Sequence, residues 1–247
     1  MKSIAHISPL RPGKRVLFVR NLSKTFTLHT QGGARIEAFS NLNIEVREGE
    51  CLALHGPSGA GKSTLLRALY ANYKPCAGSI MVKHHNSWVD MVTAAPRTVL
   101  AVRHDTMAYV SQFLRVIPRV SCLDIVAERL TAHGEDEGIA RDKAGSLLER
   151  LHIPERLWNL APATFSGGEQ QRVNIAHGFI RRCPVMLLDE PTASLDAANR
   201  KTVMALIEEA KAAGVAIVGI FHDEAVRDAV ADRFFELHPQ EAAPCAA

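Results

Sequence analysis

The sequence predicts an α/β protein with a mostly parallel sheet, an antiparallel β portion and an inserted helical subdomain. Three features of the 247-residue chain support this fold class. Short apolar runs typical of buried strands alternate with segments of helical periodicity. Residues 42–46 alternate apolar with polar side chains, as in a half-buried antiparallel strand. Residues 121–182 contain several helical segments and no convincing strand.

The first half of the chain supplies the antiparallel portion and the start of the parallel sheet. Strands are predicted at residues 16–21, 42–46, 51–55 and 106–110. The run at 51–55 is apolar almost throughout and precedes a glycine, which is typical of a buried strand. A helix is predicted over 62–73 because four apolar residues recur at helical spacing: Leu65, Leu66, Leu69 and Tyr70.

The second half begins with helices and then returns to alternation. Helices at 123–131, 139–151 and 168–182 form the predicted helical subdomain, which occupies about 113–182. After it come strand 185–189, helix 197–213, strand 215–221, helix 223–231 and strand 233–237. Such alternation implies a parallel sheet with helices on both faces. We expect one folded domain over 16–237, a loose leader over 1–15 and a loose tail over 238–247.

Composition excludes several functional classes. The formal net charge of +3 does not by itself indicate nucleic-acid binding, which usually requires a clustered basic face, so we expect no nucleic-acid partner. The longest apolar stretch, residues 214–221, is far short of the ~20 residues of a membrane span. Any membrane role therefore requires a partner. The five cysteines form no CxxC pair, which favours reduced thiols and a cytoplasmic location.

A phosphate-binding loop lies between a predicted strand and a predicted helix. Residues 56–63 fit the pattern G-x-x-x-x-G-K-[ST]. The glycines let successive backbone N–H groups face phosphate oxygens, and the following helix adds its positive N-terminal end. We expect Lys62 to contact the β- and γ-phosphates and Ser63 to bind Mg²⁺. The predicted ATP phosphate-binding residues are Gly56, Pro57, Ser58, Gly59, Ala60, Gly61, Lys62, Ser63 and Thr64.

Two consecutive carboxylates end the predicted strand at 185–189. We expect Asp189 to hold Mg²⁺ at the strand tip, a usual role for a carboxylate in nucleotide sites. Glu190 lies one residue further on, where it is expected to orient a water that attacks the γ-phosphate.

A second phosphate-binding helix end precedes these carboxylates. The sequence Phe165-Ser-Gly-Gly-Glu-Gln-Gln-Arg172 opens a predicted helix, and its small residues leave backbone N–H groups exposed. It resembles the LSGGQ signature of the ATP-binding-cassette (ABC) family, with Phe in place of Leu and Glu in place of Gln. One chain cannot easily close both helix ends on a single nucleotide. Two chains related by a twofold axis can, each contributing its signature in trans through Ser166, Gly167, Gly168 and Glu169.

The resemblance extends over residues 16–237 and assigns the remaining positions. It identifies the chain as a P-loop NTPase of ABC type that binds ATP and Mg²⁺. Gln112 matches the Q-loop glutamine near the metal, so the implied Mg²⁺ set is Ser63, Gln112 and Asp189. Asp196 matches the D-loop, and Phe26 matches the aromatic that stacks on adenine. His222 matches the switch histidine, which completes the implied catalytic set of Lys62, Glu190 and His222.

Four segments narrow the resemblance further: residues 68–75, 112–119, 154–162 and 219–227. Together they are similar to the L subunit of the bacterial carbon–phosphorus lyase system for phosphonate use. That resemblance implies an ATPase subunit of a soluble phosphonate-processing complex, which makes α-D-ribose 1-methylphosphonate 5-triphosphate, paired with itself or another ABC subunit. No residue set beyond the ATPase site suits that exchange chemistry.

Two alternatives remain open. One is a transport motor of the lipoprotein- or macrolide-export type, paired with a separate membrane subunit. The other is a scaffold that binds ATP without turnover, which the intact Lys62, Glu190 and His222 argue against.

A partner surface is predicted beside the Q-loop, where apolar residues with basic neighbours would form an exposed patch. Its members are Phe113, Leu114, Arg115, Val116, Ile117, Arg119 and Trp158. Internal packing of the helical subdomain is the competing interpretation.

The ten histidines other than His222 show no spacing typical of metal ligands. The adjacent His84 and His85 are interpreted as part of a solvated loop.

Overall fold

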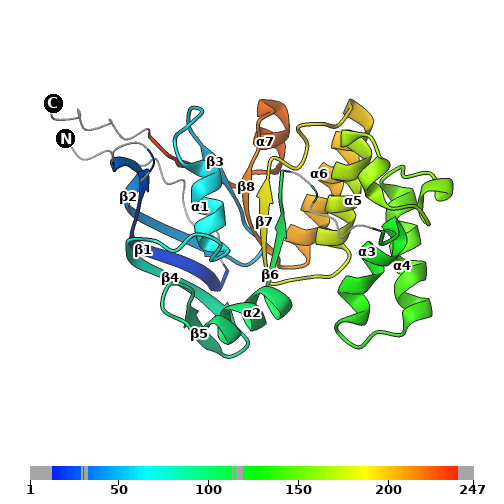
Figure 1. Ribbon diagram of the computed structural model, residues 1–247, viewed down its shortest axis with the longest axis horizontal. Coiled ribbons are helices and arrows are strands. Elements are labelled where there is room, and N and C mark those ends of the chain that lie inside the picture. The colour runs from blue at the N-terminus through cyan, green and yellow to red at the C-terminus, as the bar shows by residue number, and fades with distance from the viewer. Residues whose placement is uncertain (1–12, 29, 31–32, 113, 115–118, 239–247) are drawn as a thin grey trace.

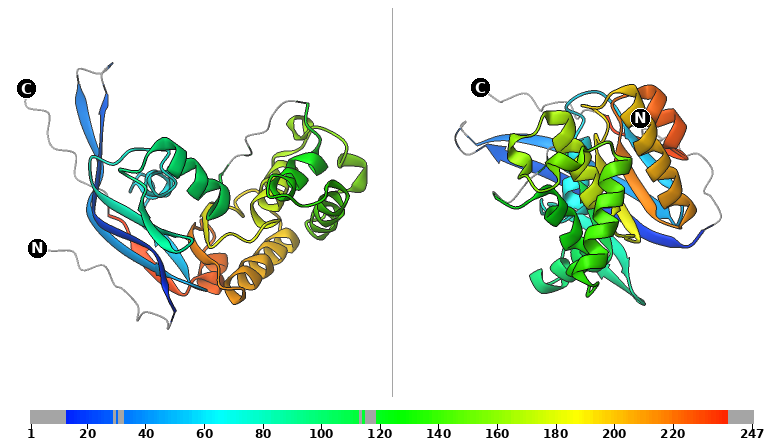
Figure 2. Two further views of the ribbon diagram at one scale, coloured as in Figure 1. Left: turned by 90° about the horizontal axis from the view of Figure 1, so that it is seen from below. Right: turned by 90° about the vertical axis from the view of Figure 1, so that its right-hand side faces the viewer.

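The computed structural model describes residues 13–28, 30, 33–112, 114 and 119–238 (Figure 1). Most of the predicted leader and tail lies outside these residues. The described part confirms the α/β fold with one parallel and one antiparallel sheet. In Figure 1 and in the left-hand view of Figure 2, the antiparallel sheet lies at one end of the molecule and helices α3 and α4 at the other. No described helix combines the length and the hydropathy that a membrane span requires.

The antiparallel sheet has the order β2-β1-β4-β5. Its strands are β1 (Arg15–Leu28), β2 (Ala34–Arg47), β4 (Ala77–His84) and β5 (Ser87–Asp90). The half-buried strand predicted at 42–46 is confirmed, because Ile44 and Val46 are buried while Asn43 is exposed. β1 and β2 are both longer than the strands predicted at 16–21 and 42–46. Bulges interrupt their pairing, and a bulge breaks the regular alternation of side chains by which a strand is recognised.

The parallel sheet has the order β6-β7-β8-β3-β9, and all its neighbours pair in parallel. Its strands are β3 (Cys51–His55), β6 (Met107–Val110), β7 (Val185–Asp189), β8 (Ala216–Ile220) and β9 (Arg233–Glu236). Successive residues of β3 face different cores: Cys51 and Ala53 join one cluster, whereas Leu52 and Leu54 join the other. The sheet is therefore covered on both faces, as apolar strands in parallel sheets require.

Helices divide between these two cores. The first core contains α1 (Lys62–Leu69), whose Leu65 and Leu66 are buried together with residues of both sheets. The second core is formed by the helices between β6 and β7 together with those that follow β7. These helices are α3 (Cys122–Thr131), α4 (Glu137–Arg150), α5 (Gly167–Phe179), α6 (Ala197–Ala212) and α7 (Glu224–Val230). Two short 3₁₀ turns, Glu155–Leu157 and Pro162–Thr164, connect α4 to α5.

Two local expectations need correction. The helix predicted over 62–73 ends at Leu69, because Ala71 adopts a left-handed conformation with φ 58°. The segment between residues 74 and 105, for which no element is predicted, contains β4, β5 and α2 (Pro96–Asp105). β4 and β5 were missed because their pattern is partly polar, and α2 because its only buried residue is Val102.

Candidate functional site

The predicted site residues gather at one edge of the parallel sheet. Gly56 follows β3, Asp189 ends β7, and His222 and Gln112 each lie two residues beyond the ends of β8 and β6. These four strands are neighbours, and parallel strands place their carboxyl ends at the same edge. Ligands of open α/β sheets bind outside these carboxyl ends.

The phosphate loop depends on glycine at two positions. Gly56 and Gly61 have φ values of 138° and 88°, a range that side-chain-bearing residues rarely adopt. A Cβ atom would also lie 2.2 Å from the carbonyl oxygen of Leu237 at Gly56, and 2.5 Å from that of Ala38 at Gly61. Gly59, in contrast, would meet no described atom within 4 Å, so the loop is open on that side.

Lys62 lies within this loop. Its ammonium group donates hydrogen bonds to the carbonyl oxygens of Gly56 at 2.7 Å and Pro57 at 2.8 Å. The side chain lines a cavity together with Ser58, Glu190 and His222. Lys62 and two of its predicted catalytic partners therefore face one space.

Asp189 is held by two hydroxyl groups. The Ser63 hydroxyl donates to Oδ1 at 3.0 Å, and the Tyr109 hydroxyl donates to Oδ2 at 2.9 Å. The structure thus brings together two of the three predicted Mg²⁺ ligands. Tyr109 was not predicted as a site residue. The available signal was its position three residues before Gln112, at the end of an apolar strand.

The third predicted ligand lies beside the neighbouring carboxylate. The Gln112 amide donates to Oε2 of Glu190 at 3.2 Å. Glu190 has φ 52°, which is unusual for a residue with a long side chain, and its N–H is held by the Ile220 carbonyl at 3.0 Å. Strained conformations of this kind cluster at functional sites.

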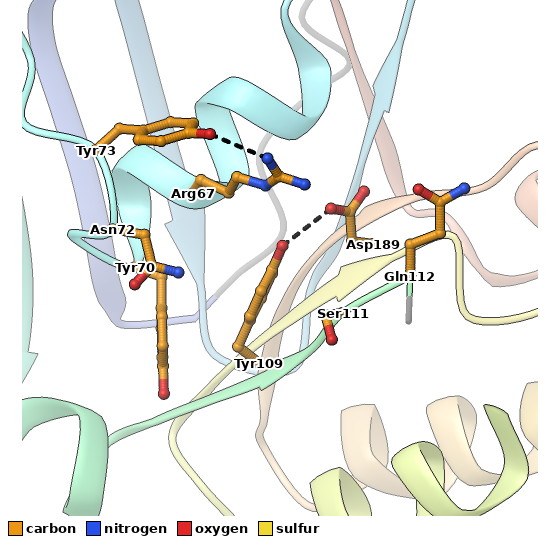
Figure 3. Close-up of a pocket in the computed structure, with 8 residues that line it drawn as sticks. All are labelled: Arg67, Tyr70, Asn72, Tyr73, Tyr109, Ser111, Gln112 and Asp189. Carbon is orange, nitrogen blue, oxygen red and sulfur yellow. Dashed lines mark hydrogen bonds between the residues drawn. The ribbon is translucent and has the colours of Figure 1, made fainter. Parts of the chain in front are cut away.

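A second cavity adjoins Asp189 and Gln112 (Figure 3). The C-terminal end of α1 and the turn after it supply one wall, through Arg67, Tyr70, Asn72 and Tyr73. Arg67 donates to the Tyr73 hydroxyl at 3.1 Å, and the rings of Tyr70 and Tyr109 stack with centroids 5.1 Å apart. The segment 68–75 therefore faces the predicted metal ligands.

The signature opens α5, as predicted. Ser166 is its N-cap, and Ser166 and Glu169 form a capping box: the Ser166 N–H donates to the Glu169 carboxylate at 2.9 Å. The Ser166 hydroxyl also donates to this carboxylate, and both bonds hold the pKa of Glu169 below its usual range. Glu in place of Gln at this position therefore stabilises the helix start. A Cβ atom at Gly167 would meet nothing described within 4 Å, and one at Gly168 would lie 3.1 Å from the Ser194 carbonyl oxygen.

Asp196 and Phe26 lie away from the phosphate loop cavity. Asp196 caps α6 by accepting a hydrogen bond from the Asn199 N–H at 2.8 Å, which lowers its pKa. Phe26 contacts Tyr73 edge-on, with ring centroids 5.4 Å apart, and Lys24 lies over its ring. Among the described residues, neither side chain lines the cavity that contains Lys62 and Glu190. Their roles in nucleotide binding stay predictions.

The predicted patch beside the Q-loop is only partly visible. Phe113 and residues 115–118 lie outside the described residues. Leu114 and Trp158 pack against the core of the helical subdomain. The Trp158 indole also donates to the Ile153 carbonyl at 3.0 Å. Both residues are only partly buried, so each packs against the core and keeps part of its surface exposed, and Arg119 is exposed. Binding of a partner at this surface stays a prediction.

This donor set fits a magnesium nucleotide. Mg²⁺ prefers hard oxygen ligands and binds nucleotide sites through one or two protein oxygens and the phosphates. The Ser63 hydroxyl and the Asp189 carboxylate meet that preference, and the space beside Gly59 leaves the phosphate loop open on that side.

Comparisons with known proteins agree with this description. The family profile described as "ABC transporter" matches residues 39–193. The lipoprotein-releasing system ATP-binding protein LolD of Shewanella denitrificans is 33% identical over 210 residues, which are 85% of this chain and 87% of that protein. The uncharacterized ABC transporter ATP-binding protein YvrO of Bacillus subtilis is 29% identical over 208 residues, 84% and 87% of the two chains.

Structural similarity extends over the same range. The ATP-binding cassette MJ0796, solved as a dimer in a post-hydrolysis state bound to ADP and Pi, has a TM-score of 0.81 to this chain at 26% identity. The match covers 94% of this chain and 99% of that chain.

Proposed function

Because the chain belongs to the ATP-binding-cassette family of ATPases, we propose that it closes with a second cassette around ATP and hydrolyses it at their shared interface. The arrangement of the two phosphate-binding helix ends carries this proposal. The signature contributes none of the described residues that line the cavity around Lys62. In both Figure 1 and Figure 2, α1 and α5 lie in different parts of the molecule. Gly59 and Gly167 are both open, so each helix end has space for a phosphate-bearing partner.

Each side chain has a distinct task in this proposal. Lys62 and the loop N–H groups bind the β- and γ-phosphates, and Ser63, Asp189 and Gln112 would hold Mg²⁺. When bound, Mg²⁺ neutralises charge on the phosphate oxygens. Glu190 orients the attacking water, and His222 lies across the same cavity where it reaches the γ-phosphate.

We further propose that the cassette serves a cytoplasmic phosphonate-processing complex of the carbon–phosphorus lyase type. The support is the resemblance of segments 68–75, 112–119, 154–162 and 219–227 to the L subunit of that system. Three of these segments adjoin the ATPase site: 68–75 lines the cavity beside Asp189, 112–119 begins with Gln112, and 219–227 contains His222. The relatives reported above, at 29–33% identity, are named for lipoprotein release and for an uncharacterized ABC transporter, so their similarity supports the cassette and not this cargo.

A transport motor is the second candidate, and the relatives favour it. LolD is named for lipoprotein release, and no relative reported above is named for phosphonate use. In this alternative the chain would couple ATP hydrolysis to a separate membrane subunit.

Affinity purification at native expression level distinguishes the two assemblies. Cells grow on methylphosphonate as the only phosphorus source, and soluble and membrane fractions are identified separately by mass spectrometry. The phosphonate proposal predicts recovery of soluble phosphonate-system proteins. It also predicts that a deletion strain complemented with Lys62→Ala grows on phosphate but not on methylphosphonate. Recovery of an integral membrane subunit, with normal growth of the deletion strain on methylphosphonate, would establish the transport motor instead.

A further inference from the structure

Four histidines surround Asp105 at the opposite edge of the parallel sheet from the ATPase site. Asp105 ends α2 and comes two residues before β6, whose N-terminal end lies beside α2 at the lower edge of Figure 1. His104 is its neighbour in sequence, and His133 follows α3. His84 and His85 come from the end of β4 and the turn after it. The interpretation of His84 and His85 as a simple solvated loop is therefore incomplete.

The ligand-type atoms of these residues are close together. His104, Asp105 and His133 each offer one such atom, and all three atoms lie within 4.8 Å of one another. Nδ1 of His104 is 2.6 Å and Nε2 of His133 is 3.5 Å from Oδ1 of Asp105. The two imidazole rings stack, with centroids 3.9 Å apart and an interplanar angle of 17°, so one ring must turn before both nitrogen lone pairs point at a single ion. Residues from α2 and from the end of α3 thus converge on one carboxylate oxygen.

The surroundings of His133 favour a cation at this position. Its Nδ1 lies 2.9 Å from the Arg129 carbonyl oxygen, and its Nε2 lies 3.2 Å from the His104 carbonyl oxygen as well as near Asp105. A neutral imidazole has one N–H, so one ring nitrogen would turn its lone pair toward oxygen lone pairs. Either a second proton or a metal ion at Nε2 removes this conflict. The Nδ1–H donor to a backbone carbonyl is then the usual orienting contact of a metal-binding histidine.

The other side of the carboxylate is also occupied by histidine. Oδ2 of Asp105 is 3.7 Å from Nε2 of His85. His84 binds the Thr106 hydroxyl through Nδ1 at 2.7 Å, which leaves its Nε2 available. Arg181 is the nearby cation, but its guanidinium donates to the carbonyl oxygens of His104 and Asp105.

We propose that His104, Asp105 and His133 bind one divalent transition-metal ion of the zinc class, with His84 and His85 flanking the free carboxylate oxygen. Two imidazoles and one carboxylate suit Zn²⁺, Ni²⁺ or Cu²⁺ rather than Mg²⁺, which prefers oxygen ligands. Tetrahedral zinc places its ligands about 3.3 Å apart, given metal–ligand distances of ~2.0 Å. The His133–Asp105 separation already matches this value, and the His104–Asp105 pair needs to open by less than about 1 Å.

Such an ion would tie the helical subdomain to the sheet-containing half. His133 follows α3, whereas His104 and Asp105 end α2, and 29 residues separate the two histidines. The site contains none of the residues assigned to ATP or Mg²⁺, so its occupancy can be measured without nucleotide.

The test is a calorimetric titration of the full-length protein with ZnCl₂, in the absence of Mg²⁺ and ATP. The unsubstituted protein is expected to bind one Zn²⁺ with saturation. His104→Ala combined with His133→Ala should weaken binding at least tenfold. His238→Ala is the matched control, because the His238 side chain is 49% exposed and that of His104 is 48% exposed. It should leave the affinity unchanged.

A second measurement guards against misfolding of the double variant. Its circular dichroism and ATPase activity should match those of the unsubstituted protein. Added Zn²⁺ should raise the melting temperature of the unsubstituted protein but not of the double variant, and EDTA should reverse the rise. Absence of saturable Zn²⁺ binding by the unsubstituted protein, or equal affinity in the double variant, would overturn the proposal.

Discussion

The hydroxyl of Tyr109 donates a hydrogen bond to Oδ2 of Asp189 at 2.9 Å, while the hydroxyl of Ser63 holds Oδ1 at 3.0 Å (Figure 3). Both oxygens of the predicted metal-binding carboxylate are therefore oriented. Burial and the charge of Asp189 raise the pKa of Tyr109 well above its usual value, so the phenol stays a donor throughout the neutral range. Tyr109 contacts Asp189 across 80 residues of sequence.

Tyr109→Phe is expected to raise the Mg²⁺ concentration that gives half-maximal ATPase activity about tenfold. The reason is that a hydrogen bond to a charged group contributes about 1.5–3 kcal/mol, and its loss leaves Asp189 free to turn. The measurement is ATPase rate against free Mg²⁺ at saturating ATP. Tyr73→Phe is the control, since Tyr73 lines the same cavity but binds Arg67. Coincident Mg²⁺ curves for Tyr109→Phe and the parent would show that Tyr109 does not position the carboxylate.

Glu190→Gln is expected to lower ATP turnover about 10²–10⁴-fold, because the amide cannot accept a proton from the attacking water. ATP binding should persist, since the substitution leaves Lys62 and the phosphate loop intact. Lys62→Ala should instead weaken ATP binding. Steady-state turnover and equilibrium binding of a fluorescent ATP analogue separate the two effects. Parental turnover by Glu190→Gln at saturating ATP would remove Glu190 from the catalytic set.

Ser166→Arg is expected to prevent ATP-dependent dimerisation. An arginine at the N-cap of α5 removes the capping hydroxyl and fills the space that the partner's phosphates would need. Light scattering of Glu190→Gln with ATP should show a dimer, and Glu190→Gln with Ser166→Arg should stay monomeric. A dimer in the combined variant would contradict the sandwich arrangement. If Glu190→Gln alone stays monomeric, the second cassette is a different chain.

Gly178→Ala is expected to destabilise the fold even though alanine is the better helix former. A Cβ atom at residue 178 in α5 would lie 2.3 Å from a Val110 methyl group. Overpacking costs about 1–3 kcal/mol, whereas the gain in helix propensity is about 1 kcal/mol. Urea denaturation should therefore show a lower free energy of unfolding.

Gly138→Ala in α4 serves as the comparison, because its Cβ atom would meet only an Asp136 carboxylate oxygen, at 3.1 Å. Combining Gly178→Ala with Val110→Ala should cost less than the sum of the two single substitutions. Strict additivity would show that the two residues do not clash.

Elements with local signals can be predicted from the amino-acid sequence alone. The buried strands at 51–55 and 185–189 have the bounds that their apolar runs predicted. The phosphate loop, the carboxylate pair and the signature were recognisable because each occupies a few consecutive residues. The order of motifs along the chain also implied a parallel sheet, and parallel strands bring these motifs to one edge.

Contacts between side chains that are distant in the sequence become visible only in the folded structure. Asp189 was predicted, but its second hydroxyl partner Tyr109 lies on another strand, and no spacing in the sequence connects the two. Asp105 and its four histidines likewise converge from β4, α2 and the end of α3. Trp158 packs inward because the helical subdomain offers it an internal contact. Such contacts depend on strand order and helix packing, which arise from the burial of apolar surface across the whole chain rather than from any one segment.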